Sequence, residues 1–200
     1  MRRALMLAAI AVLATNARAQ TQNVGARAQT QNVTVSSVPM EDEFFVMKAY
    51  ADGIAEVAKS QLAMQRATQP AIREFAERMV REHTECDNKL VEMARTKRIA
   101  LPATIDAVQT ACINRLAALS GSDFDKAYIK AQMCAHECAL QLFEKESCKG
   151  EDKDIKDMAA KAIPTLQGHA KSAFELGGEQ AEYKKFCKIQ DYAKQVKAEK

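Results

Sequence analysis

Four long stretches of this chain carry apolar residues at the spacing of an α-helix, and this periodicity restricts the fold more than any other feature. The stretches cover residues 41–68, 70–98 and 122–149 and a segment between Gly150 and Gly177. Nothing in the sequence shows the alternation typical of a β-strand. The first stretch illustrates the helical pattern with Phe44, Met47, Ala51, Ile54, Ala58 and Leu62. The sequence therefore predicts an all-α protein.

Turn and capping residues separate these stretches. Pro70 marks the start of a helix, because a proline at the first helical position lacks only an N–H that would have no partner there. The connection before residue 122 contains a short amphipathic helix over residues 105–119. Ser122 and Asp125 resemble a capping box and are expected to begin the next long helix.

Helices of this length with one apolar stripe must bury it against one another. At the usual rise per residue, about 27 residues span about 40 Å. Four such helices bury their stripes in a bundle. A chain of 200 residues is long enough for one domain of this kind and too short for two of ordinary size. We therefore predict a ferritin-like four-helix bundle over residues 41–177, with the short helix in its second connection.

The N-terminus has the features of a cleavable signal peptide. Two arginines precede an apolar run over residues 4–14, and residues 17–19 have the small-x-small pattern that signal peptidase cuts. We predict that residues 1–19 are removed and that the protein is periplasmic or secreted. The apolar run is shorter than the roughly 20 residues that cross a bilayer, and the mature chain is predicted to contain no transmembrane segment.

The segments that flank the bundle differ in composition. Residues 20–40 are expected to form a flexible leader, because the segment at 18–24 is repeated at 27–33 and consists mostly of small and polar residues. Residues 178–200 are charged, with apolar residues again at helical spacing. They are predicted to form an extra C-terminal helix that packs on the bundle or stands free.

Removal of the signal peptide changes the charge of the protein. The whole chain has 29 basic and 26 acidic residues, and residues 1–19 contain three of the arginines and no acid. The mature chain is therefore formally neutral, which removes the electrostatic basis for binding nucleic acid or an anionic membrane. A protein partner is compatible with this surface, although the sequence specifies neither the partner nor the oligomeric state.

Six cysteines would enter an oxidising compartment, where an even number predicts disulfides. They are Cys86, Cys112, Cys134, Cys138, Cys148 and Cys187. Cys134 and Cys138 lie one helical turn apart with His136 between them, but their side chains fall on a different face of the helix. We therefore expect these two residues to be separate disulfides or buried thiols, and not a metal cluster.

Each of the three histidines lies on the apolar side of a different long helix. His83 and His136 are at the middle of their helices, and Glu56 is at the same level of the first helix. His169 lies about five residues past the middle of its helix, an offset of roughly 8 Å, and Pro164 bends that helix. Two interpretations remain open. Each histidine is a core residue satisfied by a neighbouring carbonyl or carboxylate, or the four residues converge on a metal ion.

Convergence of the three histidines and Glu56 would create a site for one transition metal ion. Three imidazoles and one carboxylate suit zinc, iron or copper. Met79 lies one turn before His83, and Met133 lies near His136, which would admit copper. Methionine at helical spacing is nevertheless usually a core residue.

Four segments within residues 43–176 together carry a family resemblance. They read FFVMKAYADGIAEVAKSQLA, PAIREFAERMVREHT, GSDFDKAYIKAQMCAHECALQLFEKE and IKDMAAKAIPTLQGHAKSA. The chain resembles the DUF4142 family of exported bacterial helical proteins, which implies a ferritin-like fold. The family has no established biochemical role, so the resemblance implies no activity. Five residues stand where the family pattern has the same residue types: Glu56, His83, His136, Pro164 and His169.

The sequence also departs from the di-iron proteins of the wider ferritin-like group, which carry Glu-x-x-His on two helices. Val80 and Leu166 stand three residues before His83 and His169, which argues against ferroxidase or oxygenase chemistry of that type. The chain has no nucleophile elbow, phosphate loop or H-E-x-x-H motif. We therefore predict an exported, non-enzymatic domain that acts in envelope stress or protein interaction. The alternatives are a mononuclear metal-binding protein and, last, a hydrolase or oxidase that uses the metal.

Overall fold

The computed structural model describes residues 36–179 and residue 182. Within them lie five α-helices and no strand, which confirms the all-α prediction. The helices are α1 (Met40–Arg66), α2 (Pro70–Lys97), α3 (Ala107–Ala117), α4 (Gly121–Lys149) and α5 (Lys153–Leu176). The predicted signal peptide, most of the leader and most of the predicted C-terminal helix lie outside the described residues.

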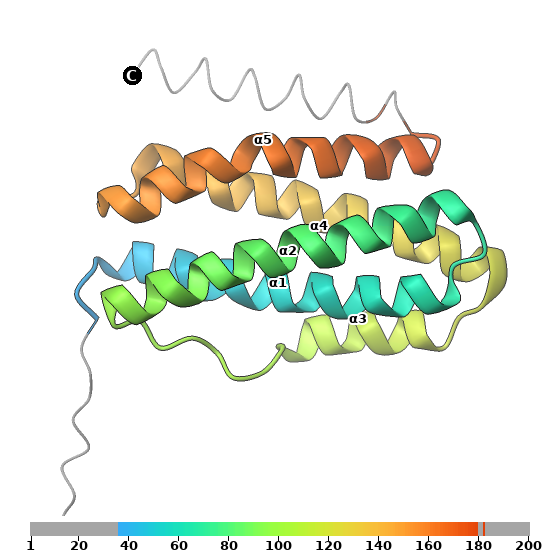
Figure 1. Cartoon of the computed structure of the whole chain (residues 1–200), viewed down its shortest axis with the longest axis horizontal. Helices are drawn as coiled ribbons and strands as arrows, with labels where there is room; N and C mark the ends of the chain where they lie inside the picture. The colour runs from blue at the N-terminus through green and yellow to red at the C-terminus, as the bar shows by residue number, and fades with distance from the viewer. Residues whose placement is uncertain (1–35, 180–181, 183–200) are drawn as a thin grey trace, which may run out of the picture. The chain divides into compact units, whose positions relative to one another are not determined.

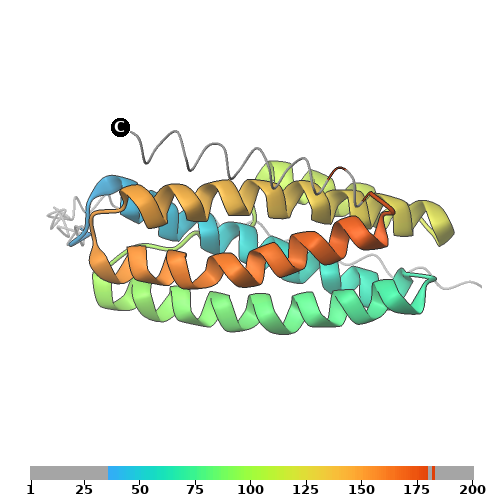
Figure 2. The same ribbon diagram turned by 90° about the horizontal axis from the view of Figure 1, so that it is seen from above.

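The long helices form two antiparallel hairpins, α1 with α2 and α4 with α5 (Figure 1). The hairpins pack against each other through α1 with α4 and α2 with α5, and Figure 2 shows the resulting bundle from above. The short helix α3 lies in the connection between the hairpins and packs on α1 and α4. The predicted four-helix bundle with a short helix in its second connection is confirmed. None of the described helices combines the length and apolarity needed to cross a membrane.

The apolar side chains gather in two clusters, one toward each end of the bundle. The cluster near the α1–α2 turn includes Phe75 and Tyr128, whereas the cluster near the α4–α5 turn includes Phe45 and Phe143. Full burial of a large apolar side chain stabilises the fold by about 1.5–3 kcal/mol. Between the clusters lies a polar layer of buried side chains, which we define as Glu56, Lys59, Gln132, His136 and His169 together with the partly buried His83.

An aspartate from the opposite hairpin fixes the α1–α2 turn. The Asp125 carboxylate accepts hydrogen bonds from the Thr68 N–H at 3.0 Å, the Thr68 hydroxyl at 2.5 Å and the Gln69 N–H at 3.2 Å. The predicted capping box is therefore wrong. The N-cap of α4 is Ser120, without a side-chain cap hydrogen bond, and the Asp125 carboxylate instead accepts from the turn N–H groups of the other hairpin.

The α4–α5 turn is held in the same way from the other side. Asp42, near the start of α1, accepts hydrogen bonds from the backbone N–H of Glu151 at 3.2 Å and from that of Asp152 at 2.5 Å. Both aspartates are about 1% exposed. Each buried carboxylate therefore receives its hydrogen bonds from a turn, and the N–H groups of that turn find their acceptor in the carboxylate. The two hairpins are thereby fastened to each other at both ends of the bundle.

Candidate metal centre

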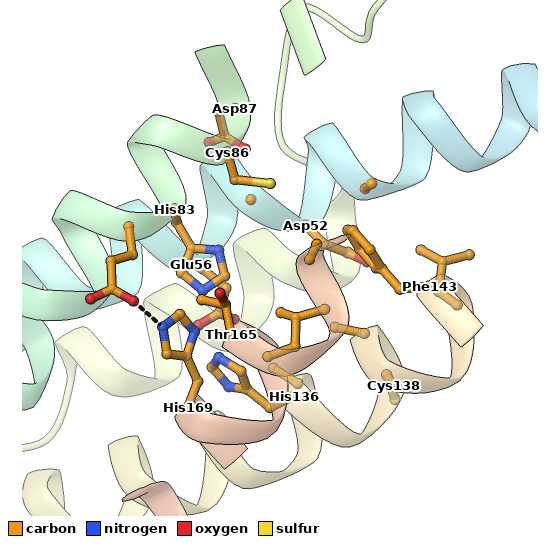
Figure 3. A pocket seen from close by; sticks show the side chains of 18 of the residues that line it. Asp52, Glu56, His83, Cys86, Asp87, His136, Cys138, Phe143, Thr165 and His169 are labelled. Carbon is orange, nitrogen blue, oxygen red and sulfur yellow. Dashed lines mark hydrogen bonds and ion pairs between the residues drawn. The ribbon is translucent and has the colours of Figure 1, made fainter. Parts of the chain in front are cut away.

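The three histidines meet in the polar layer although they come from three helices. His83 lies on α2, His136 on α4 and His169 on α5. Their ring centroids are 5.6 Å apart for His83 and His136, 5.5 Å for His83 and His169, and 5.2 Å for His136 and His169. One nitrogen from each ring lies within 4.8 Å of the other two nitrogens. Figure 3 shows the rings grouped between the helices.

The position of α5 along α4 explains how His169 reaches the other histidines. Gly177, just after α5, lies against the side chains of Ile129 and Met133, so α5 ends well short of the start of α4. The middles of these helices are therefore not level. Counted from the turn they share, His136 is 13 residues before the end of α4 and His169 is 16 residues after the start of α5. That is a difference of about 4.5 Å, so the offset expected from the helix middles was too large.

Two of the imidazoles use one nitrogen in a hydrogen bond that orients the ring. His136 Nδ1 lies 2.9 Å from the Gln132 carbonyl oxygen, and His169 Nε2 lies 2.7 Å from Glu82 Oε2. A carbonyl or carboxylate oxygen only accepts, so these ring nitrogens carry the hydrogen and the other nitrogen of a neutral ring carries a lone pair. The hydrogen bonds thus leave His136 Nε2 and His169 Nδ1 as potential ligand atoms.

Each of the three rings has one nitrogen without a hydrogen-bond partner among the described residues. His83 Nε2, His136 Nε2 and His169 Nδ1 are buried and make no hydrogen bond. Burial is also the main reason that the histidine pKa values are lowered, to about 4 for His83 and about 3 for His169, and in the same direction for His136. All three rings are consequently neutral at pH 7, which is the state in which imidazole binds a metal.

Glu56, the predicted fourth ligand, lies beside the histidines with both oxygens engaged. Its Oε1 is paired with the buried Lys59 ammonium, and its Oε2 accepts a 2.6 Å hydrogen bond from the Gln132 side chain. Burial alone would raise the pKa of Glu56, but Lys59, His136 and His83 together outweigh burial and lower the pKa. The structure thus brings the three histidines together and leaves Glu56 next to their cluster, not within it.

Three residues of the site were missed by sequence reasoning. Gln132 links Glu56 to His136, because its side chain donates to the first and its carbonyl accepts from the second. Lys59 neutralises Glu56, and Glu82 orients His169. The only available signals were the spacings of four residues from Gln132 to His136 and three from Glu56 to Lys59. Such spacings are common between solvated residues of a helix.

A cavity of about 830 Å³ reaches the histidines and is lined by residues from all five helices. Asp87 lies in this cavity one helical turn after His83, and Figure 3 shows both on α2. The residue is 8% exposed, its Oδ1 has no hydrogen-bond partner among the described residues, and burial raises its pKa to about 7. Asp87 was also absent from the residues predicted for the site.

The cysteines and methionines take no part in the histidine cluster. Cys134 and Cys138 are exposed, so the expected separation from the buried His136 is confirmed and the alternative of buried thiols is wrong. The five cysteines in the described residues are free, Cys187 lies outside them, and disulfides stay a prediction. Met79 and Met133 belong to the apolar cluster near the α1–α2 turn and do not line the cavity.

Fold and site together define a helical-bundle protein with a buried cluster of three histidines in its polar layer. The model of the family described as a domain of unknown function (DUF4142) matches residues 18–176. The chain therefore belongs to the DUF4142 family. None of the curated protein sequences searched matches it significantly.

Solved structures of related architecture share the fold. A DUF305 fragment from Deinococcus radiodurans is 12% identical with a TM-score of 0.64, over 70% of this chain and 97% of that chain. CopM in the Cu(II)-bound form is 14% identical with a TM-score of 0.59, over 68% of this chain and 95% of that chain. CopM in the Cu(I)-bound form is 13% identical with a TM-score of 0.57, over 67% and 93%. At these identities the likeness shows a common fold.

Proposed function

We propose that this protein is an exported, non-enzymatic domain that binds one transition-metal ion through His83, His136 and His169. Two observations carry the proposal: the three rings each offer a nitrogen within 4.8 Å of the other two, and each ring has a buried nitrogen to which the described residues offer no hydrogen bond. Each buried polar group without a partner costs about 1–3 kcal/mol. Coordination of a single ion would satisfy all three nitrogens at once.

The surroundings of the rings fit a metal site as well. A metal-bound imidazole usually donates the N–H of its other ring nitrogen to a carbonyl or carboxylate, which fixes the orientation of the ring and of its lone pair. The Gln132 carbonyl and Glu82 occupy these positions for His136 and His169. The other interpretation, in which the histidines are satisfied core residues, accounts for these two hydrogen bonds. It leaves unexplained the three buried nitrogens that have no hydrogen-bond partner among the described residues.

Neutral imidazoles suit copper, zinc and iron. Copper is the first ion to test, because CopM shares the fold and has been solved in Cu(I)-bound, Cu(II)-bound and Ag-bound forms. The location of the protein in the periplasm or outside the cell rests on residues 1–19, and removal of that segment belongs to the proposal. So does the division into a leader, a bundle over residues 41–177 and a C-terminal extension.

Metal analysis of the full chain, exported by its own leader and purified without a histidine tag, tests the proposal. About one equivalent of a transition metal is expected in the native protein and less than about a tenth in a His136→Ala protein, because a preformed site is lost with its ligands. A Cys134→Ser/Cys138→Ser protein is the matched control and should retain the metal. Less than about a tenth of an equivalent in the native chain, after incubation with copper or zinc, would refute the proposal.

A further inference from the structure

The charged side chains that act on the three imidazoles balance one another. Two acids and two bases have the main electrostatic effects on the pKa values of the rings, and they are Glu56, Glu82, Lys59 and Arg78. Each acid has a cationic partner. Glu56 is paired with Lys59, which is 2% exposed, and Glu82 contacts both Arg78 and Arg81. The surroundings of the histidine cluster therefore hold no excess of negative charge.

The possible ligand atoms of the cluster include no carboxylate oxygen. The group whose ligand atoms lie within 4.8 Å of one another comprises His83, His136 and His169 and no other described residue. The Asp87 carboxyl of the same cavity lies against α1, because a Cβ atom at Gly53 would be 1.9 Å from Asp87 Oδ1. An ion at the cluster would therefore be held by neutral ligands from the protein.

The positions at which other metal-binding bundles carry acids are apolar in this chain. In di-iron bundle proteins, a glutamate stands three residues before a ligand histidine on the same helix. Val80 stands in this position before His83, and Leu166 stands there before His169. Leu166 lines the cavity and belongs to the apolar cluster near the α4–α5 turn. The chain thus has histidines of such a centre without the carboxylates that accompany them.

Charge then decides which ions the cluster can hold. The cost of moving an ion from water into a buried site rises with the square of its charge, so a divalent ion costs about four times as much as a monovalent ion of equal size. Carboxylate ligands offset this cost with negative charge, whereas neutral imidazoles do not. Imidazole is nevertheless a good ligand for copper, which also exists as a monovalent ion. A neutral cluster in neutral surroundings therefore favours the monovalent ion.

We propose that the histidine cluster selects a soft monovalent cation, such as Cu⁺ or Ag⁺, over divalent cations. This inference rests on the proposed function and adds the charge class of the ion. The ion pair of Lys59 with Glu56 then contributes to selectivity, because it cancels the charge of the acid that α1 places beside the rings. Leu166 contributes as well, because it occupies a position where an acid would add negative charge.

The inference is tested by titrating the full chain with Ag⁺ and with Zn²⁺ while the ring signals of its three histidines are followed by NMR. Buffers that fix the concentration of the free ion keep ions bound to thiols out of the comparison. Half-saturation of the ring signals is expected at a free Ag⁺ concentration at least about tenfold below that of Zn²⁺, because burial of a divalent ion costs several kcal/mol more.

The other outcomes of this titration are equally clear. Half-saturation by Zn²⁺ at the same free concentration as Ag⁺, or at a lower one, would overturn the inference and leave the proposed function standing. Ring signals that respond to neither ion would overturn both the proposed function and the inference.

Substitution of Leu166 tests whether the missing negative charge is the cause. Leu166→Glu adds a carboxylate at a position that lines the cavity, and Leu166→Gln is the matched control of similar shape without charge. Zn²⁺ affinity is expected to be at least about tenfold higher in the first variant than in the second. Ag⁺ affinity should differ by a smaller factor, because Coulomb attraction is proportional to the charge of the ion.

Equal Zn²⁺ affinity in the two variants would contradict the inference, because an added anion would then leave the preference unchanged. A parallel gain for both ions would contradict it too. The titration of the wild-type chain decides the inference whether or not these variants fold.

Discussion

The two hairpins of the bundle are alike at their ends and differ in their middles. Each begins with a buried aspartate that holds the turn of the other hairpin, and the second helix of each contributes one histidine to the polar layer. The first helices differ, because α4 contributes His136 and Gln132 whereas α1 contributes Glu56 and Lys59. Three helices therefore contribute imidazoles, and the fourth contributes a buried ion pair. The two hairpins thus have similar architecture, and the histidine cluster is asymmetric because α1 alone contributes no histidine.

The two ends of the bundle also differ in the charged groups that surround their aspartates. Burial raises the pKa of Asp125, but its hydrogen bonds from Thr68 and Gln69 outweigh it and lower the pKa. Asp42 has a second acid beside it, Glu146, whose pKa is raised to about 7 by burial and by the charge of Asp42. The α4–α5 end of the bundle is therefore sensitive to pH in a range where the α1–α2 end is not.

The largest effect is expected where α1 differs from α4. Lys59→Ala leaves the buried Glu56 carboxylate without its ion-pair partner and should lower the free energy of unfolding by about 3–5 kcal/mol. Urea denaturation measures this. The double variant Lys59→Met/Glu56→Gln removes both charges and should be clearly more stable than Lys59→Ala. If the double variant is as unstable as Lys59→Ala, an unpaired Glu56 charge is not the cause of the loss.

Removal of the two aspartates compares the hairpin ends directly. Asp125→Ala leaves two backbone N–H groups and a hydroxyl without their acceptor. It should lower the free energy of unfolding by about 1–3 kcal/mol at pH 7. Asp42→Ala should cost less, because it also relieves the repulsion on Glu146. Thermal or urea unfolding of both proteins at one pH gives the order, and a larger loss for Asp42→Ala would contradict the difference drawn between the ends.

Substitution of Glu146 isolates the effect of pH. Its pKa in the folded protein, about 7, lies above the ordinary value of 4.5, so its contribution to stability is fully present below pH 4.5 and is lost as pH rises through 7. Glu146→Gln should therefore be more stable than the wild type at pH 8, by about 1 kcal/mol or more, and should lose this advantage at pH 4.5. Unfolding curves at the two pH values measure it, and an advantage independent of pH would be inconsistent with a titrating Glu146.

The smallest effect is expected at two exposed cysteines of α4, which lie at the edge of the cavity. Cys134→Ser/Cys138→Ser changes two exposed side chains and should alter the free energy of unfolding by less than about 0.5 kcal/mol. Urea denaturation under reducing conditions tests this. A loss above about 1 kcal/mol would show that these exposed side chains contribute to packing as buried ones do.

The sequence predicted the long helices well, because their apolar periodicity and their Pro and Gly boundaries are local properties. It also placed His83 and His136 level with each other. It overestimated the offset of His169, because that depends on how far α5 runs along α4, which local signals do not record. Asp125 was misassigned since N–H groups of another hairpin compete for its carboxylate. Lys59, Gln132, Glu82 and Asp87 were missed because a buried polar residue within a helix has the same spacing pattern as a solvated one.

The polar layer between the two apolar clusters has a consequence for how the chain selects its native alignment. Apolar side chains alone tolerate sliding of one helix past another, because each apolar contact that is lost is replaced by a similar one. A slip of one helical turn, about 5.4 Å, would carry the Lys59–Glu56 pair or an imidazole into a purely apolar layer and leave it without partners. The buried polar residues thereby fix the register of the four helices, since only one alignment gives every one of these side chains its partners.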